Sequence, residues 1–154
     1  MKQRRIEEED LGPMKLIFNY ENVFYSFFYD DISGCIHRSR EYAMNYVYSG
    51  EMILDNGKQQ IHVGKGECVY IPRDHHITMY KRTFNGERYC GIFLNFTRNF
   101  LREMYAKFGQ CKIPADTSKL KPEVIKLPKT AEITSLFASL TPFFDPEVKP
   151  RDDF

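Results

Sequence analysis

The sequence predicts a mostly β fold, a sandwich or barrel of short strands followed by two helices. Between Leu16 and Phe96, short segments rich in Val, Ile, Tyr and Phe are separated by turn residues such as Asn85-Gly86. After Phe96 the apolar residues recur at helical spacing instead. A chain of 154 residues is long enough for one domain with one core.

Composition and charge exclude several classes of protein. With 42% apolar and 15% aromatic residues, the chain is too apolar for intrinsic disorder. The 22 Lys and Arg against 21 Asp and Glu leave a net charge of +1, so the chain lacks the basic surface that neutralises several DNA phosphates. The opening MKQRRIEEED holds no apolar signal core, and the four cysteines lie too far apart for a zinc-binding pair. We expect a cytoplasmic protein with no membrane segment and no cofactor.

The clearest strand pair is the hairpin over residues 52–63, which reads MILDNGKQQIHV. Its Asn56-Gly57 suits a two-residue type I′ turn, in which both central residues take a positive φ. Such a turn would pair Asp55 with Lys58 and so set the register of the two strands. Alternation then gives the hairpin one polar face and one core face. The core face consists of Met52, Leu54, Ile61 and Val63.

The spacing after the strands predicts a first helix over residues 98–108. Thr97 is a favourable N-cap, because its hydroxyl can accept a hydrogen bond from the first turn, and Gly109 is placed to end the helix. The apolar residues of this helix are Phe100, Leu101, Met104, Tyr105 and Phe108.

A second helix is predicted after Thr130 and ends near Pro142, which cannot continue a helix. Residues 124–127, between the two helices, are expected to add one edge strand. The apolar stripe of the second helix is expected to pack on its own barrel; the alternative is contact with a second subunit. That stripe consists of Ile133, Leu136, Phe137 and Leu140.

Common catalytic and nucleotide-binding motifs are missing from the sequence. Gly64-Lys65-Gly66 lacks the third glycine and the following helix of a dinucleotide fingerprint. No serine stands in G-x-S-x-G, and no cysteine stands in a known nucleophile signature. The candidate functional residues that remain are histidines and aromatic residues.

Two stretches of the sequence resemble the two motifs of a cupin barrel: HRSREYAMNYVYSGEM at 37–52 and GKGECVYIPRDHH at 64–76. In particular they are similar to the N-terminal effector domain of AraC-type transcription activators. The tail at 130–146 is similar to the segment that joins the barrel to the dimerisation helices in one branch of that family. The residues that carry the resemblance are Tyr46, Val47, Ser49-Gly50-Glu51, Gly66-Glu67 and Ile71-Pro72.

This resemblance implies a jelly-roll cupin barrel and a regulatory role without enzymatic activity. It divides the chain into an N-terminal extension at 1–15, a barrel at 16–96 and a helical tail at 97–154 that packs on the barrel. A helix-turn-helix DNA-binding domain is expected beyond this chain, and the chain would contact DNA only through it. The barrel would bind a small molecule or a protein effector, favour one docking of the helices, and form a weak homodimer.

The resemblance also tests for a metal site, because metal-binding cupins place two His and one Glu in the first motif and one His in the second. Only His37 keeps its position here, while Ser39 and Ala43 replace the second His and the Glu. Ile77 stands where the last His belongs, and His76 is one residue short, on the opposite face of a strand. We therefore expect no bound metal. The alternative function, a small stand-alone metal-dependent cupin isomerase or dioxygenase, would need a metal or an acid-base pair in the barrel.

Polar and aromatic residues on the barrel strands are the candidates for binding an effector. Ser39 and Ala43 are small where metal-binding cupins have bulky ligands, and Asn45 shares their inward face by alternation. These side chains could equally serve as ordinary barrel core. The candidate lining comprises His37, Ser39, Asn45, His76, Met79 and Tyr89.

Overall fold

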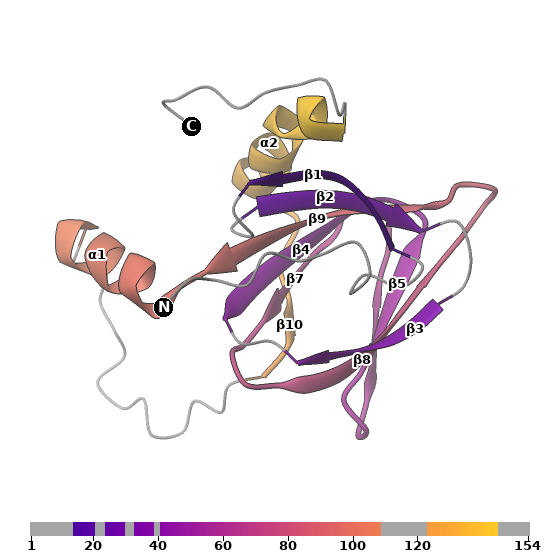
Figure 1. Ribbon diagram of the computed structural model, residues 1–154, viewed down its shortest axis with the longest axis horizontal. Coiled ribbons are helices and arrows are strands. Elements are labelled where there is room, and N and C mark those ends of the chain that lie inside the picture. Colours follow the sequence, from indigo (N-terminus) through magenta and orange to yellow (C-terminus); the bar gives the residue numbers. More distant parts are fainter. Residues whose placement is uncertain (1–13, 21–23, 30–32, 39–40, 109–122, 145–154) are drawn as a thin grey trace.

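Two antiparallel sheets pack face to face in the computed structural model, which describes residues 14–20, 24–29, 33–38, 41–108 and 123–144 (Figure 1). This arrangement, with its two following α-helices, confirms the predicted mostly β jelly-roll barrel. The six-stranded sheet has the order β1 (Met14–Tyr20), β2 (Phe24–Tyr29), β9 (Tyr89–Phe96), β4 (Tyr42–Ser49), β7 (Cys68–Ile71) and β10 (Ile125–Lys126). The four-stranded sheet has the order β3 (Ser33–Arg38), β8 (His76–Arg82), β5 (Glu51–Asp55) and β6 (Gln60–Val63).

The main apolar core lies between the two sheets, as the side chains described for 41–108 and 123–144 show. Inward residues alternate with outward ones along each strand; in β5, Met52 and Leu54 are fully buried and Ile53 between them is partly exposed. Each large apolar side chain buried in this way contributes about 1.5–3 kcal/mol to folding. The core cluster comprises Ala43, Val47, Met52, Leu54, Val63, Val69, Ile71, Ile77, Met79, Tyr89, Phe93 and Val124.

The β5–β6 hairpin has the predicted core face but not the predicted register. Asp55 pairs with Gln60 rather than with Lys58, so the loop is two residues longer than a type I′ turn allows. Because side chains alternate with a period of two, a shift of two residues leaves both faces unchanged. Three predicted core residues of the hairpin are fully buried and the fourth, Ile61, is partly buried against the same cluster; the buried residues are Met52, Leu54 and Val63.

The loop is stabilised by side-chain hydrogen bonds, and only one of the two expected central residues takes a positive φ. Gly57 has a φ of 84°, whereas Asn56 is not among the described residues with positive φ. The Asn56 Oδ1 instead accepts hydrogen bonds from the backbone nitrogens of Lys58 and Gln59, both at 2.9 Å. The Asp55 Oδ1 accepts another from the Gly57 nitrogen at 2.7 Å. Asn and Asp commonly stabilise turns in this way, and here they replace the predicted turn.

The Ser-Gly-Glu segment carries the chain from the six-stranded sheet to the four-stranded one. Gly50 has a φ of 69°, and a Cβ built there would lie 2.6 Å from the Tyr89 Cα, so only glycine fits. Ser49 on one side donates a hydrogen bond to the Arg88 carbonyl oxygen at 2.7 Å. Glu51 on the other side begins β5. The segment therefore joins the two sheets at the end of the β4–β9 ladder, where Ser49 pairs with Cys90.

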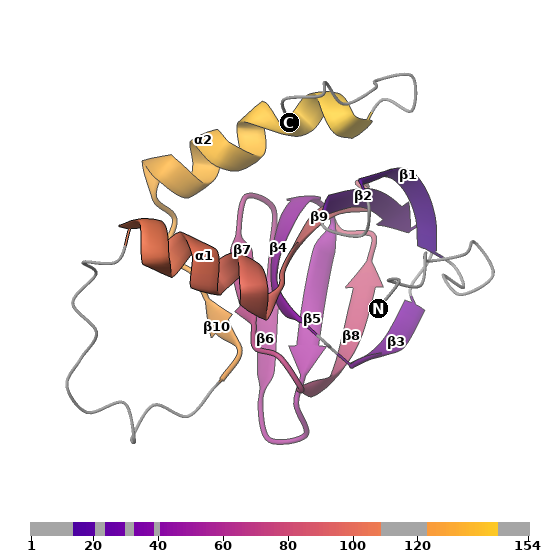
Figure 2. The same cartoon turned by 60° about the vertical axis from the view of Figure 1, so that its left-hand side comes forward.

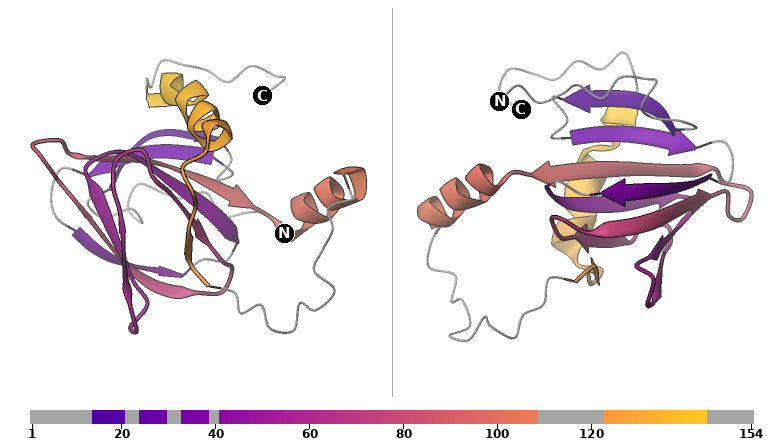
Figure 3. Two further views of the ribbon diagram at one scale, coloured as in Figure 1. Left: turned by 180° about the vertical axis from the view of Figure 1, so that it is seen from behind. Right: turned by 60° about the horizontal axis from the view of Figure 1, so that its bottom comes forward.

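The first helix, α1 (Arg98–Phe108), has the predicted bounds. The Thr97 Oγ1 accepts a hydrogen bond from the Phe100 nitrogen at 3.1 Å, which confirms the predicted N-cap. The helix extends away from the sheets (Figure 3), and none of its residues is buried. This differs from the expectation that the helical tail packs on the barrel.

The second helix, α2 (Ala131–Ser139), and the 3₁₀ helix η2 (Thr141–Phe144) cover the outer face of the six-stranded sheet (Figure 2). The Thr130 Oγ1 accepts a hydrogen bond from the Ile133 nitrogen at 3.3 Å, and the helix ends before Pro142 as predicted. Strand β10 pairs with β7 and confirms the predicted edge strand. In the described part of the chain, no helix has the length and apolar character needed to cross a bilayer.

Candidate functional site

A hydrogen-bonded polar pair is buried between the two sheets. Asn45 of β4 and Tyr89 of β9 are both fully buried, and the Tyr89 hydroxyl donates to the Asn45 Oδ1 at 2.9 Å. The Asn45 Nδ2 donates to the Ile92 carbonyl oxygen at 3.2 Å. A buried polar group without a partner costs about 1–3 kcal/mol, so these bonds hold both side chains in place. Gly91 makes room for the ring, since a Cβ there would lie 2.5 Å from the Tyr89 hydroxyl.

Lys81 of β8 adds a charged group to this interior. The residue is only 3% exposed, and its Nζ lies 5.8 Å from the centre of the Tyr89 ring and 5.5 Å from that of Phe93. Both distances are within the range of cation–π attraction. Asn45, Lys81 and Tyr89 together are called the interior cluster below. Burying a lysine is costly unless its amine has partners, so Lys81 is a candidate for a functional role in the barrel.

Lys81 is the functional candidate that sequence reasoning missed. Its signal was strand alternation, because Lys81 stands two residues after Met79 and four after Ile77, both of which are buried in β8. The lining candidates predicted from the sequence were sought among histidines, small residues and aromatic residues, and they do not include Lys81. The tertiary structure buries it, since Tyr89 and Phe93 of the opposite sheet cover it.

The structure brings three of the six predicted lining residues into the interior. Asn45, Met79 and Tyr89 are all fully buried between the sheets. His76 is exposed, because its neighbour Ile77 takes the inward position in β8. His76 is therefore wrong as a lining residue. The buried residues pack directly into the core cluster, so an effector would have to enter by moving them.

The two remaining candidates are His37 and Ser39. His37 pairs with Ile77 in the β3–β8 ladder, and Ser39 lies outside the described residues. Ala43 is buried at the position where metal-binding cupins have a Glu. Among the residues that the structure describes, no three His, Cys, Asp or Glu side chains come close enough to hold a metal ion.

Aromatic residues on the outer side of β4 form the seat of α2. The ring of Tyr46 stacks on that of Phe137 with centroids 4.4 Å apart. The Tyr48 hydroxyl donates a hydrogen bond to the Phe137 carbonyl oxygen, and the Tyr48 ring meets Phe144 edge-on at 4.8 Å. Burial raises the pKa of Tyr48, with smaller contributions from Tyr46 and Cys68, so the hydroxyl remains a donor at neutral pH. We call Tyr46, Tyr48 and Phe137 the helix seat.

Most of the predicted apolar stripe of α2 packs against the outer face of the six-stranded sheet. Phe137 and Leu140 are buried, and Ile133 is partly buried against the same cluster. Leu136 points outward and is 45% exposed. Cys68 lies beneath the helix in this cluster, where burial raises its pKa to about 12 and keeps the thiol neutral.

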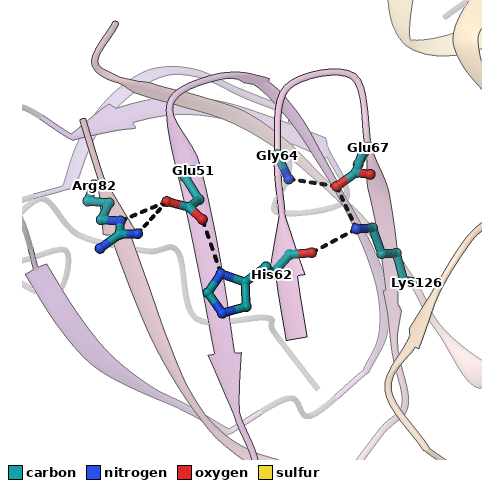
Figure 4. Close-up of polar contacts among 6 residues, drawn as sticks. All are labelled: Glu51, His62, Gly64, Glu67, Arg82 and Lys126. Atoms are coloured by element: carbon teal, nitrogen blue, oxygen red, sulfur yellow. Dashed lines mark hydrogen bonds and ion pairs between the residues drawn. The ribbon is translucent and has the colours of Figure 1, made fainter. Parts of the chain in front are cut away.

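A polar network links the edges of the two sheets where β10 meets β6 (Figure 4). The Lys126 Nζ of β10 lies 2.7 Å from a Glu67 carboxylate oxygen and donates to the His62 carbonyl oxygen at 2.9 Å. Burial disfavours ionised Glu67, but the hydrogen bond from the Gly64 nitrogen and the Lys126 charge outweigh it and lower its pKa. Lys126 thus fastens β10 to Glu67 and to β6.

The same network continues across the four-stranded sheet (Figure 4). The His62 Nδ1 lies 3.1 Å from one Glu51 oxygen, and the Arg82 Nε and Nη2 lie 2.7 Å from the other. The hydrogen bond to His62, followed by the contacts with Arg82, lowers the pKa of Glu51. The Glu of the Ser-Gly-Glu segment is therefore a structural anion that ties three strands together.

The chain is similar in sequence to one protein family and in structure to several solved proteins. Residues 42–154 match the model of the ExsA N-terminal regulatory domain. A search of curated proteins finds no match. Three similar solved structures are of ToxT from Vibrio cholerae. Its P21 crystal form has 10% sequence identity and a TM-score of 0.59, and the match covers 85% of this chain and 50% of that one. Its complex with an unsaturated fatty acid has 9% identity and a TM-score of 0.57, covering 80% of this chain and 46% of that one. Its complex with (E)-4-(8-methylnaphthalen-1-yl)but-3-enoic acid has 12% identity and a TM-score of 0.54, covering 85% of this chain and 51% of that one. The chain spans about half the length of these proteins, and at such identities the likeness concerns the fold alone.

Proposed function

Because the chain belongs to the ExsA N-terminal regulatory domain family of AraC-type transcription regulators, we propose that its barrel senses a small effector with an apolar body and a carboxylate. The observation that carries this proposal is Lys81, whose ammonium is buried beside the Asn45–Tyr89 pair. In an interior of low dielectric, an ammonium and a carboxylate attract each other far more strongly than in water. The two ToxT ligands named above are carboxylic acids, which supports the same class of ligand.

The signal would leave the barrel along β4. Asn45 belongs to the interior cluster, while its neighbour Tyr46 stacks on Phe137 of α2 on the other face of the strand. An effector that displaces Asn45 or Tyr89 would therefore shift the strand that holds α2. The effector can change the docking of α2 only by as much as it prefers one arrangement over the other.

The output of this switch lies outside the chain. A helix-turn-helix domain elsewhere in the protein would bind DNA, in the cytoplasm and as a homodimer, and this chain would not contact DNA itself. The net charge of +1 supports that division, because binding to duplex DNA depends on several cationic contacts with phosphates.

The chain itself is proposed to have no catalytic activity and no metal. Two features support this: the Cys68 thiol is kept neutral by burial, and Asn45 and Tyr89 are neutral side chains that bond to each other. A stand-alone cupin enzyme would need a metal ion or an acid-base pair in the barrel. Elemental analysis of the purified chain is expected to find no stoichiometric Zn, Fe or Mn. One such ion per chain would favour the enzyme instead.

The effector proposal is tested by calorimetric titration of the chain with an unsaturated fatty acid and with its methyl ester, both below their critical micelle concentrations. The acid is expected to bind at least tenfold more tightly than the ester, because only the acid carries the charge that Lys81 attracts. Equal binding of acid and ester would refute the proposal without reference to any variant.

Variants assign the effect to Lys81. Lys81→Met should lower the affinity for the acid to that of the ester, and Lys81→Arg should preserve most of the preference. Lys58→Met is the matched control, because Lys58 is exposed in the β5–β6 loop. Circular dichroism shows whether each variant is folded. A folded Lys81→Met variant with unchanged affinity for the acid would rule out Lys81 as the anchor.

A further inference from the structure

Helix α1 carries an apolar stripe that nothing in the described part of the chain covers. Leu101, Met104, Tyr105 and Phe108 follow the spacing of one helix face, and their exposed fractions run from 36% to 67%. We call these four residues the α1 stripe. An isolated helix of eleven residues is only marginally stable in water, and a continuous apolar face is a common mark of an interaction site.

The α1 stripe has a basic border on both sides. At about 100° per residue, Arg98 and Arg102 lie along one edge of the stripe and Lys107 lies along the other. All three are exposed. Glu103, the acidic residue of α1, falls on the opposite face of the helix. The surface is thus apolar in the centre and positive at its rims.

These charges decide between the candidate occupants of the stripe. A second copy of α1 would bring two sets of basic rims together, and like charges across an interface are unfavourable. A lipid surface would take a basic amphipathic helix, but stable anchoring generally needs a second signal besides a short apolar face. A helix with an apolar face and acidic rims satisfies both the stripe and its border.

We propose that α1 is the docking site of a partner protein that presents an amphipathic helix with Asp and Glu beside its apolar face. The first turn of α1 is held in position by the barrel, since the ring of Phe100 stacks on that of Phe96 in β9 with centroids 5.9 Å apart. A helix of this length extends about 16 Å, so its contact area suits a transient regulatory association rather than a permanent complex. The site is separate from the interior cluster and does not depend on a carboxylate effector.

Two fluorescent helical peptides with the same apolar face test this proposal, one flanked by Glu and the other by Lys. Anisotropy titrations of the chain are expected to show at least tenfold tighter binding of the Glu peptide, with the difference shrinking as salt is added. Equal binding of the two peptides, or binding of neither, would overturn the proposal. Binding to vesicles rich in phosphatidylserine with no binding of the Glu peptide would overturn it in favour of a lipid surface.

Variants assign the binding to α1. The double variant Leu101→Ser with Phe108→Ser should abolish binding of the Glu peptide. The double variant Arg98→Glu with Arg102→Glu should reverse the preference and bind the Lys peptide, which mere loss of folding could not produce. Leu136→Ser is the control, because Leu136 is a similarly exposed apolar residue on α2.

Sedimentation of the unmodified chain and of the Leu101→Ser, Phe108→Ser double variant tests whether a second copy of the chain occupies the α1 stripe. Both are expected to show the same oligomeric state. A dimer that the double variant turns into a monomer, without any peptide binding, would make the α1 stripe a self-association surface and refute the proposal.

Discussion

The two helices carry similar apolar stripes but have opposite surroundings. In α2, Phe137 is completely buried on Tyr46 of the sheet, whereas Phe108 of α1 is 67% exposed. The difference lies in what the barrel offers each helix. Strand β4 presents two outward tyrosines to α2, whereas α1 is separated from β9 by Thr97 alone and continues away from the sheets (Figure 1). Amphipathic spacing shows that a helix face needs a partner, but not which partner it has.

Replacing one phenylalanine in each helix should show the difference between the two helices most clearly. Phe137→Ala is expected to lower the free energy of unfolding by about 3–4 kcal/mol, because it empties a buried site between α2 and β4. Phe108→Ala should change it by less than about 0.5 kcal/mol, as is usual for exposed positions. Urea denaturation measures both. Equal losses in the two variants would mean that α1 is as firmly packed as α2.

Removing one hydroxyl from the helix seat should have a smaller effect. Tyr48→Phe keeps the ring but leaves the Phe137 carbonyl oxygen without its donor, which should cost about 1–2 kcal/mol. Tyr105→Phe on the exposed α1 stripe is the matched control and is expected to be neutral. If Tyr48→Phe left the denaturation midpoint unchanged, the hydroxyl would not hold α2.

The two N-caps should separate global from local stability. Thr130→Ala removes the cap of a docked helix and is expected to lower global stability by about 1 kcal/mol. Thr97→Ala removes the same bond from α1 and should reduce helicity without moving the unfolding midpoint. Hydrogen exchange of the α1 and α2 amides, together with circular dichroism, distinguishes the two outcomes. A fall in global stability with Thr97→Ala would contradict this picture.

Acid should weaken the attachment of β10 and leave α1 unaffected. The pKa values of Glu51 and Glu67 are lowered in the folded chain, so their ionised forms stabilise it above the ordinary value of 4.5. This stabilisation is lost as the pH falls below 4.5 and through the lowered pKa values. The expected loss is below about 1 kcal/mol for each group. Thermal melts between about pH 6 and pH 3 should show less pH dependence in Glu51→Gln and Glu67→Gln; an unchanged slope would argue against the network.

Some features of the fold and site were predictable because they depend on neighbouring residues. The bounds of α1 follow from a cap that acts over three residues, from Thr97 to Phe100. The core face of the hairpin follows from alternation, which explains why Met52 and Leu54 are buried although the predicted turn is wrong. Alternation likewise places Asn45 inward.

Other features of the site could not be predicted in this way. His76 was expected to line the barrel and is exposed, because Ile77 took the inward position beside it. Lys81 was not expected there and is buried, because aromatic rings from β9 cover it. Alternation along β8 is consistent with both orientations, but it does not show that an inward lysine stays buried, because that depends on the aromatic rings of the other sheet.

The sequence by itself determined the β class, the helix positions and the inward faces of the strands, because periodicity and capping act within a few residues. Only the tertiary structure decided that α2 docks and α1 does not, and that a lysine lies in the interior. The physical reason is that these outcomes depend on contacts between distant segments, such as Tyr48 and Phe137, which are 89 residues apart. Local patterns state which surfaces must be covered, and the packing of the whole chain decides what covers them.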